Sequence, residues 1–221
     1  MKDRLRELWK GFFPTKYFWP RLIACVLAVI TMGFSLSWLI LVDMGTDPCT
    51  LMNTSISQTI GWSLGNWQAF LNSILFVIII WAGARNLGLG TIANMFLVGY
   101  SIDFFSWIWS MILPKGLFES MVVKVAILIP AIIVFVFAVA VYIDMQMGTS
   151  PYDAIPSVIK AHFPKLSYTG IRIFYDGGIS VIGLLFGGKI GIVTIFMIFA
   201  MGPVIEWVSE LIKKKWDFSE E

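Results

Sequence analysis

Six apolar stretches, each close to the length that crosses a lipid bilayer, constrain the fold of this chain more than any other feature. A helix needs about 20 consecutive apolar residues to cross the hydrocarbon core of a membrane. The stretches lie at 22–42, 67–84, 91–113, 122–143, 169–186 and 190–212. The first two carry no charge, whereas the fifth contains Arg172 and Asp176 and the sixth contains two glutamates. The sequence therefore predicts an all-α polytopic membrane protein with six transmembrane helices.

The composition excludes several other classes of protein. Apolar residues make up 58% of the chain and charged residues 14%, whereas soluble chains are nearer about 45–50% and 25%. A net charge of +2 is too small for a nucleic-acid-binding surface, and two cysteines cannot form a disulfide framework. The chain has one histidine and no Walker, HExxH or CxxC pattern. We expect no enzymatic activity, no metal and no cofactor.

The distribution of lysine and arginine predicts the orientation in the membrane. With the N-terminus in the cytoplasm, 13 of the 16 Lys and Arg residues fall on the cytoplasmic side, leaving Lys115, Lys124 and Lys189 outside. Cytoplasmic loops carry such an excess of positive charge. We therefore expect both termini in the cytoplasm. Residues 1–20 are basic and amphipathic, which is typical of a short helix on an anionic membrane surface.

The chain also repeats itself at an offset of 103 to 104 residues. The motif MGTDP at 44–48 returns as MGTSP at 147–151. Further pairs are Gly88 with Gly191, Thr91 with Thr194, Asp103 with Glu206, Gln68 with Arg172, and Asn72 with Asp176. Because each unit has three spans, an odd number, the second must enter the membrane upside down, as in many transporters. We expect a cytoplasmic segment at 1–20, repeats at 21–113 and 114–212, and a charged cytoplasmic tail at 213–221.

The repeated motif predicts a short amphipathic helix after the first and the fourth span. A glycine can form the sharp turn, and an N-cap residue followed by proline favours the first helical turn. These residues are Gly45, Asp47 and Pro48 in the first repeat and Gly148, Ser150 and Pro151 in the second. We expect helices at 48–60 and 151–161. Their positive ends could serve as gates or face an anion, or the helices could only pack at the interface.

Charged residues within the spans are the second candidate signal. An ionisable group inside a membrane costs several kcal/mol unless it is paired or hydrated, so it is a functional candidate. Arg172 shares a helix face with Asp176 and could pair with it or with Glu206. We expect a polar pathway for a substrate or ion between the repeats, formed by Asp103, Asp176, Arg172, Glu206, Gln68, Asn72 and Asn94. Alternatively, Arg172 could reach the lipid headgroups, Glu206 could face water, and the amides could only join helices.

The paired motifs resemble the YczE/YyaS/YitT family of integral membrane proteins, and the YczE-like branch most closely. The resemblance rests on MGTDP at 44–48, GWSLGNWQ at 61–68, LGLGTIANMFLVGYSIDFF at 87–105, MGTSPYDAIP at 147–156 and IGIVTIFMIFAMGPVIEW at 190–207. It implies a bacterial inner-membrane protein of a mostly uncharacterised family. An aspartate often follows each turn in this pattern; Asp153 keeps that place here, whereas the first repeat has Thr50.

We expect a small-solute transporter or permease that works by alternating access between the repeats. One alternative is a non-transporting membrane partner of a biosynthetic or export complex, acting through the basic N-terminal segment. Another is a substrate-binding subunit similar to the S components of vitamin importers, which Ala24 and Ala28 on the first span would fit. The expected partners are the lipid bilayer, an unidentified small solute and a second copy in a homodimer, without nucleic acid.

Overall fold

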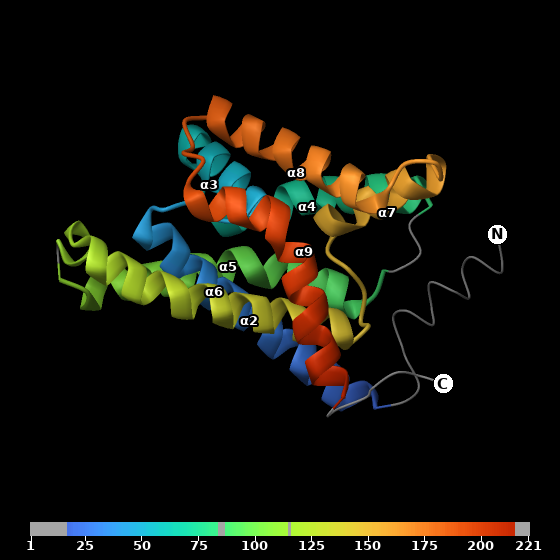
Figure 1. Ribbon diagram of the computed structural model, residues 1–221, viewed down its shortest axis with the longest axis horizontal. Coiled ribbons are helices and arrows are strands. Elements are labelled where there is room, and N and C mark those ends of the chain that lie inside the picture. The colour runs from blue at the N-terminus through green and yellow to red at the C-terminus, as the bar shows by residue number, and fades with distance from the viewer. Residues whose placement is uncertain (1–16, 84–86, 115, 215–221) are drawn as a thin grey trace.

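The computed structural model describes residues 17–83, 87–114 and 116–214, and these residues form helices and no strands (Figure 1). The α-helices are α2 (Phe18–Val42), α3 (Pro48–Ile60), α4 (Leu64–Trp81), α5 (Leu89–Ile112), α6 (Met121–Asp144), α7 (Pro151–His162), α8 (Tyr168–Leu185) and α9 (Ile192–Lys213). A short 3-10 turn, η1 (Leu117–Glu119), precedes α6. Five of them, α2, α4, α5, α6 and α9, are long and apolar enough to cross a membrane. The protein is therefore an all-helical polytopic membrane protein.

Each of the six predicted spans coincides with a helix to within a few residues. The fifth, α8, has 18 residues like α4. It is long enough to cross a membrane but not apolar enough, because its polar residues, Arg172 and Asp176 above all, lower its mean hydropathy. The surface helix expected at 1–20 lies almost entirely outside the described residues, and so does most of the tail at 213–221.

The two short helices α3 and α7 begin where the motif predicted. The backbone N–H of Thr50 donates a hydrogen bond to Oδ1 of Asp47 at 3.0 Å, and that of Asp153 donates to Oγ of Ser150 at 3.1 Å. A proline occupies the first turn of each helix. Each cap therefore satisfies one of the backbone donors that a helix leaves free at its start.

The glycines of the two turns allow a close approach between distant parts of the chain. Gly45 has a φ of 101° and Gly148 a φ of 106°, a region that favours glycine. A Cβ on Gly45 would lie 2.7 Å from Oγ1 of Thr194, at the start of α9. A Cβ on Gly148 would lie 2.5 Å from Oγ1 of Thr91, at the start of α5. Each turn thus packs against the first turn of a helix from the other half of the chain.

Backbone hydrogen bonds join the same segments. The N–H of Gly90 donates to the carbonyl of Met147 at 2.7 Å, and the N–H of Val193 donates to the carbonyl of Met44 at 3.2 Å. These four residues correspond pairwise at an offset of 103. The contact between the two halves is therefore made twice, once by each half.

Helix packing follows the same correspondence. At the centre α2 packs against α6, and apolar residues of both form most of the buried core. Around this pair, α5 packs on α2 and α4, α9 packs on α6 and α8, α3 packs on α8, and α7 packs on α4. Arg21, near the start of α2, donates from Nε to the carbonyl of Met145, just past the end of α6, at 2.8 Å. The two central helices therefore run in opposite directions.

Candidate functional site

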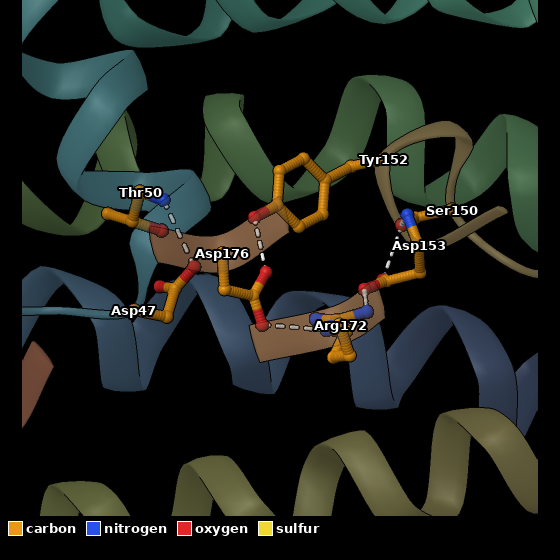
Figure 2. A network of polar contacts seen from close by, with 7 residues as sticks. All are labelled: Asp47, Thr50, Ser150, Tyr152, Asp153, Arg172 and Asp176. Carbon is orange, nitrogen blue, oxygen red and sulfur yellow. Dashed lines mark hydrogen bonds and ion pairs between the residues drawn. The ribbon is translucent and has the colours of Figure 1, made fainter. Parts of the chain in front are cut away.

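Charged and polar side chains gather where the starts of α3 and α7 meet the middle of α8 (Figure 2). The cluster consists of Asp47 and Thr50 at the start of α3, Ser150, Tyr152 and Asp153 at the start of α7, and Arg172 and Asp176 on α8. Both short helices thus direct their N-terminal ends to one place. We call these seven residues the polar cluster.

Arg172 bridges two carboxylates in the polar cluster. Its Nε lies 2.7 Å from Oδ2 of Asp176, and its Nη1 lies 2.7 Å from Oδ1 of Asp153. Hydrogen bonds between two ionised groups are about twice as strong as neutral ones. These distances confirm the predicted pairing of Arg172 with Asp176, and they show a second partner, Asp153 of α7. The alternative partner, Glu206 on α9, is exposed.

Tyr152 completes the environment of Asp176. Its hydroxyl donates to Oδ1 of Asp176 at 2.7 Å, so both carboxylate oxygens of this buried residue are hydrogen-bonded. The Tyr152 ring lies 5.6 Å from the guanidinium carbon of Arg172 and 4.9 Å from the ring of Tyr175. Sequence reasoning missed both tyrosines, although Tyr152 directly follows the proline of the repeated motif.

The polar cluster is more open on the α7 side. The side chain of Asp153 is 43% exposed and that of Arg172 33%, whereas that of Asp176 is only 5% exposed. Ser150, itself buried, donates from its hydroxyl to Asp153. The exposed part of the ion-paired group is therefore at Asp153 and Arg172, and its buried part is at Asp176.

Asp47, at the start of α3, is half-buried as a residue, whereas Asp176 is buried. One oxygen, Oδ1, accepts the hydrogen bond from Thr50, whereas Oδ2 is buried without a hydrogen-bond partner in the described chain. Asp47 precedes α3 and lies outside the spanning helices; burial raises its pKa, and the hydrogen bonds with Thr50 oppose that effect. The negative charges of Asp153 and Asp176 raise it further.

The balance of charge favours a positively charged ligand. The polar cluster contains three aspartates and a single guanidinium, which gives a formal charge of −2 if all are ionised. The N-terminal ends of α3 and α7 offset part of this charge, but their first donors already bond to their own caps. The arrangement can therefore take up a proton or a cation more readily than an anion. No three His, Cys, Asp or Glu side chains within the described ranges are placed to hold a metal ion.

Other predicted residues lie between α4 and α5 instead. Oδ2 of Asp103 accepts a hydrogen bond from the backbone N–H of Gly65 at 2.8 Å, so Asp103 fastens α5 to the start of α4. Asn72 donates to the carbonyl of Met95 at 3.4 Å. These contacts account for both side chains as links between two helices.

Gln68 and Asn94 also belong to this helix pair. Gln68 is buried against Gly99, and its Oε1 has no hydrogen-bond partner in the described chain. Asn94 is half-buried on α5. Of the residues predicted to form one pathway, Arg172 and Asp176 are thus in the polar cluster, Asp103, Gln68 and Asn72 join α4 to α5, and Glu206 is exposed on α9.

A second buried acid lies where α6 and α9 end. The Ser209 hydroxyl donates to Oδ1 of Asp144, which also lies 3.3 Å from Nζ of Lys213. Asp144 is buried, although it directly follows the predicted span 122–143. Nothing in its local sequence distinguishes it from a solvent-facing aspartate at a helix end.

Comparison with known proteins identifies the family. Residues 19–210 match the family of unknown function DUF6198, so the chain belongs to that family. It is 25% identical to an uncharacterized protein of Haemophilus influenzae over 219 residues, which cover 97% of this chain and 96% of that protein. It is 21% identical to the uncharacterized protein YyaS of Bacillus subtilis over 190 residues, 85% of this chain and 90% of that protein. No solved structure matches the chain.

These matches confirm the resemblance to the YczE/YyaS/YitT family that the motifs indicated. The chain is therefore an integral membrane protein of an uncharacterised family.

Proposed function

We propose that this protein is a small-solute transporter of the bacterial cytoplasmic membrane that works by alternating access between two inverted three-helix repeats. The observation that carries the proposal is the polar cluster, in which Arg172 joins the carboxylates of two helices and the exposed part lies at Asp153 rather than at Asp176. Charged groups on membrane-spanning helices are costly unless they are paired or hydrated, and they are therefore candidates for function. The proposed partners are the bilayer and an unidentified solute, and we propose no enzymatic reaction.

Paired backbone features support the inverted repeats. Asp43 and Gln146, which correspond at an offset of 103, are both left-handed, with φ of 52° and 51°. Gly83 and Gly187, which correspond at 104, have φ of 91° and 84°. The antiparallel central helices and the doubled contacts between turns and helix starts agree with a two-fold relation in the membrane plane.

The proposal makes α8 the sixth spanning helix. Its two charges lie four residues apart and neutralise each other, and Asp176 is on the buried face of α8, against which α3 and α7 pack. A charged pair that is covered in this way costs far less than two separate charges in the hydrocarbon. With both termini in the cytoplasm, as the lysine and arginine distribution indicates, α7 lies on the cytoplasmic side and α3 on the outer side.

The exposure of one matched pair, Asp153 and Thr50, supports a cytoplasm-open conformation. Asp153 on α7 is half-buried, whereas Thr50, its counterpart on α3, is buried. In a transporter built from inverted repeats, each repeat can adopt the conformation of the other. We call this change the exchange; it would close the α7 side and open the α3 side. The conformation described here would then be one of two.

Cysteine labelling tests the exchange without knowledge of the solute. Thr54 on α3 and Ser157 on α7 are counterparts at an offset of 103; Thr54 is half-buried and Ser157 exposed. Each is replaced by cysteine in a protein whose own Cys25 and Cys49 are alanine. A membrane-impermeant maleimide is then applied to intact cells and to inside-out vesicles.

We expect Ser157→Cys to react at once in inside-out vesicles and Thr54→Cys to react slowly in intact cells, at the rate of the exchange. If Thr54→Cys reacts only after denaturation, the two arrangements do not exchange and the proposal fails. Untargeted mass spectrometry of cells and medium then identifies the solute, by comparing the wild type with Arg172→Gln, which copies the first repeat, and with the exposed control Asp43→Asn.

A further inference from the structure

Asp47 is the acidic residue of the polar cluster that lacks a basic partner in the described chain. Asp153 and Asp176 share Arg172. Oδ1 of Asp47 accepts a hydrogen bond from the backbone N–H of Thr50, and its Oδ2 has neither a partner in the described chain nor surface that a water molecule can reach. One half of this carboxyl group is therefore unsatisfied.

The absence of space around Oδ2 restricts what can satisfy it. A water molecule or a metal cation needs a void of at least its own size beside the oxygen that it contacts. A proton needs no such space. In this conformation a proton is therefore the ligand that fits Asp47.

The surrounding charges favour the same ligand. Asp153 of α7 and Asp176 of α8 both act on Asp47 with negative charge, and Cys49 lies beside it on α3. Arg172 of α8 is already held between the other two aspartates. A buried carboxylate without a counter-charge costs much more than a buried neutral acid with one hydrogen bond missing.

The second repeat shows that the cap itself needs no charge. Ser150 takes the place of Asp47 and caps α7 with its hydroxyl. Serine and aspartate are equally good N-cap residues, so helix capping does not explain the aspartate in α3. What Asp47 has and Ser150 lacks is a carboxyl group that can take up and release a proton.

We infer that Asp47 holds a proton in the conformation open on the α7 side and is the site at which transport is coupled to protons. The inference rests on the function proposed above. When α3 moves away and water reaches Asp47, its carboxyl O–H bond breaks, the proton passes to water on the outer side, and the carboxylate remains until closure returns a proton. No other reactant is needed.

Infrared spectroscopy of the purified protein in lipid nanodiscs tests the inference directly. A protonated carboxyl group has a C=O stretching band that a carboxylate lacks and that shifts in heavy water. The variant Asp47→Ser copies Ser150, so it keeps a cap and removes the titratable group. Asp43→Asn, at an exposed carboxylate just after α2, is the matched control.

At neutral pH we expect the wild type and Asp43→Asn to show a protonated-carboxyl band that Asp47→Ser lacks. The band should disappear as the pH is raised further. Equal spectra for the wild type and Asp47→Ser would mean that Asp47 is ionised, which overturns the inference. Asp47→Asn, with the same shape and a cap of equal quality, replaces the serine variant if that variant does not fold.

Cysteine labelling separates this inference from the function on which it rests. If Thr54→Cys reacts from outside but the band is unaffected by Asp47→Ser, transport stands and Asp47 is not the proton site. If the band depends on Asp47 but the labelling of Thr54→Cys shows no exchange, the proton site stands as a buried acid and its coupling to transport is overturned. The transport function and the proton site are both supported if Thr54→Cys is labelled from outside and the band depends on Asp47. In addition, pH should change the labelling rate in the wild-type background, and Asp47→Ser should abolish that effect.

Discussion

The helices α3 and α7 share one local design but differ in burial. Both begin with a positive-φ glycine, a capping side chain and a proline. Eight of the 13 residues of α3 are buried, but only four of the 12 residues of α7. Similar turns therefore place the two helices, while the packing around them, chiefly of α3 against α8, makes α3 the more buried of the two. Four predictions test how far this equivalence extends.

The largest effect is expected from Arg172→Gln, which gives the second repeat the residue of the first. It leaves Asp153 and Asp176 close together without a counter-charge. Breaking a buried ion pair costs about 3–5 kcal/mol, and because Arg172 is one-third exposed we expect about 3 kcal/mol or less. Thermal unfolding in detergent measures it, with Arg172→Lys as the control of intermediate effect. An unchanged melting temperature would mean that the bridge contributes nothing.

Equal losses are expected from Gly45→Ala and Gly148→Ala. Each adds a Cβ at positive φ and against a helix start, and such strain costs about 1–3 kcal/mol. Gly61 has a φ of 73° and open space around it. Gly61→Ala therefore reports the backbone strain alone, without a steric clash of the added Cβ, and should cost less. Comparison of the three unfolding transitions tests the equivalence of the two turns, which a loss confined to one of them would contradict.

A smaller loss is expected from Ser150→Ala, which removes the cap of α7. Loss of an N-cap costs about 1 kcal/mol, and here the hydrogen bond from Ser150 to Asp153 is lost as well. Ser63→Ala, at the cap of α4, is the matched control without a carboxylate partner. Chemical unfolding of both variants should show a greater loss for Ser150→Ala, and the reverse order would argue against a role of Ser150 in holding Asp153.

The smallest effect is expected from Lys189→Ala. Its ion pair with Asp43 is on the surface, with side chains 79% and 60% exposed, and exposed pairs contribute about 0–1 kcal/mol. We expect unfolding to be unchanged within that range and cysteine labelling to proceed normally. A large loss would show that this surface contact, rather than the polar cluster, holds α3 and α9 in place.

Local rules made most of the helices predictable. Apolar runs of sufficient length predicted six helices, and the glycine, cap and proline of the repeated motif predicted the starts of α3 and α7. These features depend on neighbouring residues along the chain, so the sequence alone determines them. The helical spacing of Arg172 and Asp176 likewise predicted their contact.

Contacts between distant segments decided the rest. Arg172 binds Asp153 rather than Glu206 because α7 packs against α8 at that level, and Asp103 fastens α4 to α5. Asp144 is buried because Ser209 and Lys213 of α9 cover it. Such partners depend on which helix faces meet, and a helix presents side chains all around its axis. The sequence determined where each helix begins and which residues it carries, whereas the tertiary structure decided which charges pair and which side of the polar cluster is open.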